Sequence, residues 1–476
     1  LSPSSRLSMK MLSRLSFKPI ARQADSCRIV FSTYPRWFSV AAEVYTIKPD
    51  KLPAAPIKLT DLDLSMMHFP GVTTHNFYKG PLDVTGLRES LSRVVEKNPG
   101  LAGRIRSTND SGLEVHFEGN VGAVLNVREL PSEMEAALEK FDSEHIANNP
   151  LEWEQTIEKL GIQNTGPGPE QVDKDGPLLA ATYLQGEKIS TVSLSVSHLF
   201  GDGATKMMAL KAWDEEFKSP GSSVPMETRD KVMETDAFVK SSYTEWEQAA
   251  MKAFYPALYE RHTLSRDIED YSMIVVRVQE ASMKKIKASE AAKFEKGTIF
   301  SAQDALIAWI GNVLGAKWFS FTVDLRGRLE GLAANSAGNA FMTWYGTPSA
   351  PGKFTAMDIR NTINLKGLNN AKALEEALYA GLEDSIDVNS WVKLQYPPAF
   401  GGTLEKQCRA IGFGSLPFLI RLNYHVVYQV KKGEYIMFHF GLKAEEALRM
   451  ELEWRKLGET AISRVSGAEL LKVMGQ

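Results

Sequence analysis

Near the middle of the chain, residues 193–203 read Ser-Leu-Ser-Val-Ser-His-Leu-Phe-Gly-Asp-Gly. Serine and apolar residues alternate over the first five positions, which predicts a strand with one buried face. His198 continues the phase of the apolar residues, and the glycines on either side of Asp202 allow a sharp turn after the strand. The stretch therefore places a side chain that can act as a base at the end of a strand, where it could project into a cleft. A core histidine followed by an ordinary turn is the alternative that this pattern leaves open.

The composition describes a globular protein with more than one core. A chain of 476 residues exceeds one ordinary core, so we expect two domains. Hydrophobic residues make up 43% and charged residues 24%, and no apolar run is long enough to predict a transmembrane helix. The two cysteines, Cys27 and Cys408, cannot form a disulfide framework or a Cys-rich metal site. The remaining histidines lack paired spacing, so we expect no metal.

Charge is distributed unevenly along the chain. Residues 1–42 carry seven Lys and Arg residues and one acid, whereas the rest of the chain has a net charge of −9. Such an acidic body argues against general nucleic-acid binding. The basic, serine-rich opening predicts a targeting presequence, with residues 36–39 as a mitochondrial processing site, or else a disordered tail. We expect a mitochondrial location if the presequence is genuine and a cytoplasmic one otherwise.

Hydrophobic periodicity divides the remainder into two mixed blocks of helices and strands. The first, residues 43–217, contains a helix over 85–99 with Thr85 as its N-cap, and it ends with the 193–203 stretch. A Pro/Gly/Ser-rich segment opens a crossover linker that we place at 218–270. The second block, residues 271–476, opens with a strand over 273–278, and Ser301 caps its first helix.

Four further segments share a pattern with a known family. They are Asn-Pro-Gly-Leu-Ala-Gly-Arg at 98–104, Val-Asp-Leu-Arg-Gly-Arg at 323–328, Gly-Asn at 338–339 and Asn-Ser-Trp at 389–391. Together with the His-x-x-x-Asp-Gly stretch and in this order, they resemble the BAHD acyltransferases and the related fungal trichothecene O-acetyltransferases. The resemblance covers residues 56–460. It implies an α/β fold of two chloramphenicol-acetyltransferase-like domains, each a mixed β-sheet flanked by helices, with an active-site channel between them.

The resemblance also implies an activity. The family moves an acyl group from acyl-CoA, a co-substrate, to a hydroxyl or amine of a small acceptor, with no permanently bound cofactor. His198 would take the acceptor's proton, because the unperturbed pKa of imidazole lies near neutrality. Neither cysteine lies in a nucleophile motif, so direct transfer in a ternary complex is the simplest mechanism. We expect a monomeric enzyme of secondary metabolism.

The other candidate residues have less specific roles. The resemblance implies that Asp202 holds the loop by pairing with an arginine, for which Arg326 is the first candidate and Arg328 the alternative. Gly203 permits a close backbone approach, to the substrate channel or to the next helix. Trp391 and Asn389 are candidate donors to the oxyanion, with core packing as the alternative for Trp391. Ser301 could help to receive a CoA phosphate at its helix N-terminus, or it simply caps the helix.

Two departures from the family pattern keep rival functions open. The family's Asp-Phe-Gly-Trp-Gly signature survives only as Gly412-Phe413-Gly414, with Ala-Phe-Gly-Gly at 399–402 as a competing alignment, and Ser197 replaces the second histidine of condensation domains. The first departure motivates a non-catalytic binding protein on the same scaffold as a rival. A carrier-protein-dependent condensation domain is another rival, and the missing histidine argues against it. A dihydrolipoyl acyltransferase core is the third; its His-x-x-x-Asp-Gly motif closes the chain, whereas here 273 residues follow Gly203.

Overall fold

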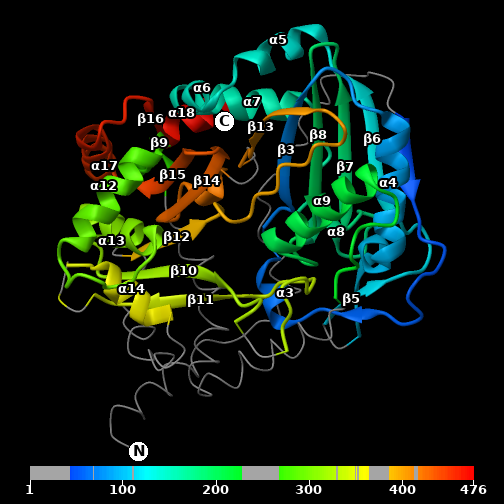
Figure 1. Ribbon diagram of the computed structural model, residues 1–476, viewed down its shortest axis with the longest axis horizontal. Helices are drawn as coiled ribbons and strands as arrows, with labels where there is room; N and C mark the ends of the chain where they lie inside the picture. Colours follow the sequence, from blue (N-terminus) through cyan, green and yellow to red (C-terminus); the bar gives the residue numbers. More distant parts are fainter. Residues whose placement is uncertain are drawn as a thin grey trace, which may run out of the picture.

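The computed structural model describes residues 43–227 and 267–475 with short gaps. The gaps are residues 68, 110–111, 329–330, 349, 351–352, 364–384 and 412–415. The predicted presequence and most of the predicted 218–270 linker lie outside the described residues. Figure 1 shows two sheet-containing halves side by side, so the predicted mixed α/β class with two domains is confirmed.

The first half is built on a six-stranded sheet of order β1-β6-β7-β8-β3-β13. Its neighbouring strands are antiparallel except for the parallel pair β6 and β7. The strands are β1 (Glu43–Ile47), β3 (Val72–Lys79), β6 (Ala123–Glu129), β7 (Leu179–Gln185), β8 (Ile189–Val196) and β13 (Thr403–Cys408). Strand β8 is the predicted alternating strand, and it is buried along its whole length.

Two long helices, α4 (Val84–Lys97) and α9 (Gly203–Lys218), share a core with the apolar residues of β8. Leu87 and Leu91 of α4 meet Leu210 of α9 there, as their helical spacing predicts. The prediction of Thr85 as N-cap is wrong. Asp83 precedes the helix, and its short carboxylate accepts the free amide of Thr85 at 3.0 Å.

The other helices of this half pack toward the second half or support loops. Phe77 of β3 and Trp153 share a core with Tyr428 and Phe438 of the second sheet, so one apolar cluster spans both halves. The remaining elements are α5 (Ser132–Lys140), α6 (Ser143–Asn148), α7 (Pro150–Lys159), α3 (Asp61–Ser65), α8 (Gly168–Gln171), the 3-10 helix η1 (Pro99–Ala102) and a small sheet of β2 (Ile57–Lys58), β5 (Leu113–His116) and β4 (Arg104–Ser107).

The second half is built on a seven-stranded sheet of order β11-β10-β12-β14-β15-β9-β16. Strands β10, β12 and β14 run parallel, and the other pairs are antiparallel. The strands are β9 (Ser272–Gln279), β10 (Trp318–Asp324), β11 (Phe341–Gly346), β12 (Ser385–Ser390), β14 (Tyr424–Lys431), β15 (Glu434–Leu442) and β16 (Ile462–Ser466).

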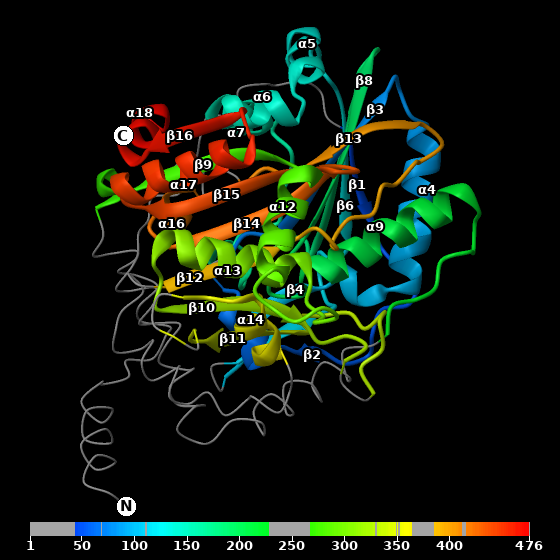
Figure 2. The ribbon, with the colours of Figure 1, turned by 60° about the vertical axis from the view of Figure 1, so that its left-hand side comes forward.

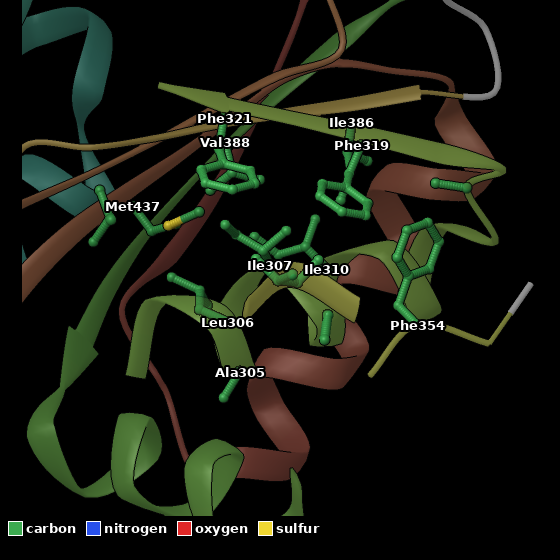
Figure 3. Close-up of a cluster of buried hydrophobic side chains, with 14 of the residues drawn as sticks. Ala305, Leu306, Ile307, Ile310, Phe319, Phe321, Phe354, Ile386, Val388 and Met437 are labelled. Atoms are coloured by element: carbon green, nitrogen blue, oxygen red, sulfur yellow. The ribbon is translucent and has the colours of Figure 1, made fainter. Parts of the chain in front are cut away.

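Helix α13 (Ala302–Leu314) lies at the centre of the second core. Figure 3 shows Ile307 and Ile310 of this helix facing Phe319 and Phe321 of β10, with Ile386 beside them. Because the helix is apolar on most sides, it is covered in turn by its neighbours. These and the remaining helices are α12 (Glu280–Ala291), α14 (Ala356–Ile363), α16 (Leu416–Leu419), α17 (Ala444–Leu457), α18 (Gly467–Val473) and η3 (Ile268–Asp270).

Strand β13 crosses from the second half to the sheet of the first half. It belongs by sequence to the second block, yet it pairs antiparallel with β3 at the edge of the first sheet, with Cys408 opposite His75. Figure 2 shows β13 running beside β3, and it is not a member of the sheet that contains β12 and β14. The predicted boundary of 271–476 therefore does not describe one sheet, because a strand's pattern does not reveal which sheet edge receives it.

No helix in the described part of the chain is long and apolar enough to cross a membrane.

Candidate active site

His198 lies in a tight loop between β8 and α9. The amides of Phe200 and Gly201 both donate to the carbonyl oxygen of Ser197, at 3.0 and 2.9 Å, and α9 begins at Gly203. The two flanking elements are buried, so the loop has a rigid support on both sides. A residue in such a position is placed precisely, as a reacting group requires.

A second contact holds the His198 backbone from the other half of the molecule. The Asn339 side chain donates through Nδ2 to the carbonyl oxygen of His198 and to Oδ1 of Asp63, each at 2.8 Å. Both Asn339 and Asp63 are fully buried, and they come from segments far apart in sequence. Asn339 therefore holds the loop and is itself anchored to Asp63, so three segments of the chain meet here.

Asp202 pairs with Arg326 in a two-bonded arrangement. Arg326 Nη1 lies 2.9 Å from Asp202 Oδ2, and Nη2 lies 3.0 Å from Oδ1. The same carboxylate caps α9 by accepting the Thr205 amide at 2.9 Å, and it accepts the Ala340 amide at 3.1 Å. Arg328, the alternative partner, is exposed and forms no ion pair with Asp202. Both carboxylate oxygens of Asp202 accept hydrogen bonds from the protein. Because Arg326 and Ala340 belong to the second half, the carboxylate joins the two halves.

Arg326 itself is fully engaged. Its Nε donates to the Ser336 carbonyl and its Nη2 to the Gly338 carbonyl, each at 2.7 Å, and Asp324 lies 3.0 Å from Nη1. Burial alone would raise the pKa of Asp202, but the Arg326 charge and the hydrogen bonds from Arg326, Thr205 and Ala340 hold it below its ordinary value. Asp202 is therefore a fixed anion rather than a proton carrier at neutral pH.

The His198 imidazole is half-buried beside the Phe69 ring, with the ring centroids 6.0 Å apart. Its Nδ1 is buried and has no hydrogen-bond partner among the described residues. Removal from water lowers the pKa of the imidazole, although the Asp202 charge and the residue's own carbonyl act in the opposite direction. The ring is therefore neutral at pH 7, and a neutral imidazole can accept a proton.

The remaining candidates are placed as follows. Asn389 lies one residue before the end of β12, and its Nδ2 donates to the Tyr424 hydroxyl at 3.0 Å. Trp391 follows the strand directly, and the Arg409 guanidinium lies over its ring at 4.9 Å from the centroid. Neither side chain donates to His198 or its loop among the described hydrogen bonds. Their assignment as oxyanion donors stays a prediction.

Gly203 makes a close approach to a side chain of the second half, rather than to the helix that follows it. A Cβ on Gly203 would lie 2.6 Å from Cδ1 of Leu394, in the segment after β12. Ser301 caps α13: its hydroxyl accepts the Asp304 amide at 3.1 Å, and the Asp304 carboxylate accepts the Ser301 amide in return. The Ser301 oxygen is thus engaged in the helix cap.

Of the two alignments for the family's glycine-rich signature, Gly412-Phe413-Gly414 lies outside the described residues. The competing segment packs on α9. Asp214 accepts the amides of Ala399 and Phe400, both at 2.9 Å, and the Phe400 ring lies 4.8 Å from Trp213. The docked segment directly precedes β13, so it helps to hold that strand against the first half.

Sequence reasoning missed the residues that hold the loop. Asn339 belongs to the Gly-Asn segment at 338–339, for which the sequence predicts no role, and nothing in the sequence points to Asp63 or Phe69. Their contacts join residues distant in sequence, which periodicity cannot reveal. The amide of Thr205 bonds Asp202 locally, but its hydroxyl contacts Arg326 and Gly338, which are 121 and 133 residues away. No cluster of three or more potential metal ligands occurs among the residues that the structure describes.

Comparison with known proteins identifies the family. The model of the Transferase family matches residues 41–395, well over half of the chain. The chain belongs to this family, that of the BAHD acyltransferases. The resemblance read from its motifs is thus confirmed, and membership assigns the chain to the acyltransferases. No protein of curated function matches it in sequence.

Several solved structures share the fold. Vinorine synthase is 16% identical, with 88% of this chain and 99% of that one covered and a TM-score of 0.59. TRI101 of F. sporotrichioides, complexed with coenzyme A and T-2, is 15% identical, with 85% and 99% covered and a TM-score of 0.57. VibH, a condensation enzyme of non-ribosomal peptide synthesis, is 14% identical, with 83% and 91% covered and a TM-score of 0.50. At such identities the likeness shows the fold.

Proposed function

We propose that the protein transfers an acyl group from acyl-CoA to a hydroxyl or amine of a small-molecule acceptor, with His198 as general base. The observation that carries the proposal is the His198 loop. Its backbone is held by Asn339, its far end is fastened by the Asp202–Arg326 pair, and its imidazole is neutral at pH 7. A neutral, rigidly positioned imidazole is what proton abstraction from an alcohol needs.

The chemistry requires no covalent intermediate. As the acceptor oxygen or nitrogen attacks the thioester carbonyl, its proton passes to His198, and the imidazolium then returns that proton to the departing CoA thiolate. The Asp202 charge favours the imidazolium that forms, although Asp202 stays paired with Arg326. Asn389 and Trp391 are the proposed donors to the oxyanion, as an amide and an indole N–H can be.

Acyl-CoA is proposed as the co-substrate from family membership, and TRI101 supports it, since its structure is a complex with coenzyme A. A channel between the halves would carry CoA and the acceptor to His198 from opposite sides. The fold of VibH favours one rival, transfer from a carrier protein. Ser197 argues against that rival, since it hydrogen-bonds Gln171 at 2.6 Å and stands where condensation domains carry a histidine.

The test is to incubate the purified protein with acetyl-CoA and longer acyl-CoAs and a pool of alcohols and amines. Free thiol is measured, and products are identified by mass spectrometry. We expect acceptor-dependent thiol release and an acylated product. Product formation only from acyl groups loaded on a carrier protein would favour the condensation reaction. Absence of any product from either donor would favour a non-catalytic binding protein.

A further inference from the structure

Two buried cations near the His198 loop have no acidic partner among the described residues. Lys206 of α9 is 1% exposed, and its Nζ donates only to the Thr74 hydroxyl. Arg409, directly after β13, is 3% exposed, and its Nη2 donates to the Leu394 carbonyl at 2.6 Å. No further hydrogen bond from either side chain occurs in the described part of the chain, so several donors remain unused.

The two side chains lie on the same side of the first sheet. Cys408 pairs with His75, so the next residue, Arg409, comes alongside Thr74, which receives the Lys206 ammonium. Burial, and after it the Arg409 charge, lower the pKa of Lys206 well below its usual value. Burial and the charges of both residues together lower the pKa of His75 to about 3. The two cations are therefore close enough to act on each other and on a third basic group.

Charged groups are almost never buried unless paired, because desolvation is costly. Arg326, Lys97 and Arg360 pair with the acids Asp202, Glu216 and Asp304. In the described part of the chain Arg104, also buried without an acidic partner, is held instead by three backbone carbonyls, whereas Lys206 and Arg409 each have a single hydrogen bond. The nearest acid along α9, Asp214, is occupied by Lys218, Tyr396 and two backbone amides.

The pair borders the proposed active site. Lys206 lies one turn into the helix that begins after the His198 loop. Leu394, whose carbonyl holds Arg409, also packs on Gly203 at the start of that helix. The Arg409 guanidinium stacks on Trp391, a candidate oxyanion donor. A negative group held by both cations would therefore belong to a molecule that reaches the reaction loop.

We propose that Lys206 and Arg409 bind a carboxylate of a substrate, so that the enzyme selects an acyl donor or an acceptor that carries a free carboxyl group. The inference rests on the proposed acyl transfer. Guanidinium geometry matches a carboxylate through two parallel hydrogen bonds, and Lys206 adds a point charge. The CoA phosphates fit less well, since the pantetheine arm separates them from the reacting thioester. The carboxyl group can sit on the acyl chain or on the acceptor.

Two matched pairs of substrates distinguish these sources. Succinyl-CoA is compared with butyryl-CoA as donor, and 4-(hydroxymethyl)benzoate is compared with its methyl ester as acceptor, by thiol release. We expect at least a 10-fold preference in kcat/KM for the carboxylate member of one pair. In Lys206→Met and Arg409→Met that preference falls to within about 3-fold. Lys211→Met, an exposed lysine of the same helix, keeps the wild-type preference.

A binding measurement keeps this test independent of the proposed function. Succinate and 4-(hydroxymethyl)benzoate are added separately, and the melting temperature of the protein is measured with each. We expect at least one of them to raise the melting temperature of the wild type, and we expect that rise to be lost in Lys206→Met. If no acyl-CoA is turned over but the Lys206-dependent rise remains, the acyl-transfer proposal fails and the carboxylate site stands. Equal use of both members of each pair, with no Lys206-dependent rise, overturns the carboxylate site while leaving acyl transfer intact.

Discussion

At the scale of single residues, the state of the His198 imidazole decides the chemistry. Its position at a strand end places it beside Phe69 in a partly dry environment, which keeps it neutral. Asp202 is close enough to favour the protonated form but is bound to Arg326, so it cannot take the proton itself. We therefore propose a single base rather than a His–Asp relay.

This assignment predicts the pH dependence of the reaction. The base must be neutral, and its pKa in the fold lies below the ordinary value of 6.5. Activity is therefore lost only as the pH falls through that lowered pKa. We expect the acidic limb of a kcat/KM profile, which reports the free enzyme, to have its midpoint below pH 6.5. A midpoint at or above pH 7 would contradict the neutral-base account.

Sequence reasoning reached some of these residues and not others. The period-two pattern placed His198 at a strand end, and the resemblance selected Arg326 as the partner with which the structure pairs Asp202. Asn339 could not be assigned, because its contact with the His198 carbonyl spans 141 residues. Sequence reasoning predicts Thr85 as N-cap and does not consider Asp83, although both residue types favour that position and only backbone geometry separates them.

At the scale of elements, the crossing strand β13 and the segment before it bind the halves together. Phe400 is 1% exposed and packs against Trp213, Phe217 and Tyr78 of the first half. Sequence reasoning does not predict strand β13. Its pairing with β3 could not be predicted either, since it depends on which sheet edge is open in the folded molecule.

Truncating the docked ring tests this element. We expect Phe400→Ala to lower the free energy of unfolding by about 3–5 kcal/mol, because it empties a filled aromatic site. The measurement is denaturant unfolding followed by circular dichroism. Leu452→Ala, on the exposed side of α17, is the control, and we expect a change within about 0.5 kcal/mol. Equal losses of unfolding free energy in the two variants would show that the docked Phe400 ring contributes no more to stability than an exposed leucine.

At the scale of the whole molecule, the Asp202–Arg326 pair is a buried charged link between the halves. The carboxylate comes from the start of α9 and the guanidinium from the end of β10, and both are buried. Because the pKa of Asp202 is lowered in the fold, its contribution to stability is present above the unfolded pKa of about 4. That contribution is lost as the pH falls through the folded pKa.

Removing the cation should therefore destabilise the protein strongly. We expect Arg326→Met to lower the free energy of unfolding at pH 7 by about 3–5 kcal/mol, since it leaves the charge of Asp202 buried without a counter-ion. Asp324→Asn removes the exposed carboxylate on the same guanidinium, and we expect a loss of at most about 1 kcal/mol. Denaturant unfolding of the two variants at the same pH measures the difference. Similar small losses in both would show that the pair is not a structural link.

The central claim is that His198 is the general base, and kcat/KM of His198→Ala tests it most directly. The assay uses the acyl-CoA and acceptor that the wild type turns over best, and circular dichroism verifies folding. We predict a loss of about 100- to 10,000-fold. His116→Ala, a half-buried histidine of the small sheet paired with Glu114, should keep wild-type kcat/KM. A folded His198→Ala variant with an unchanged rate would contradict the account.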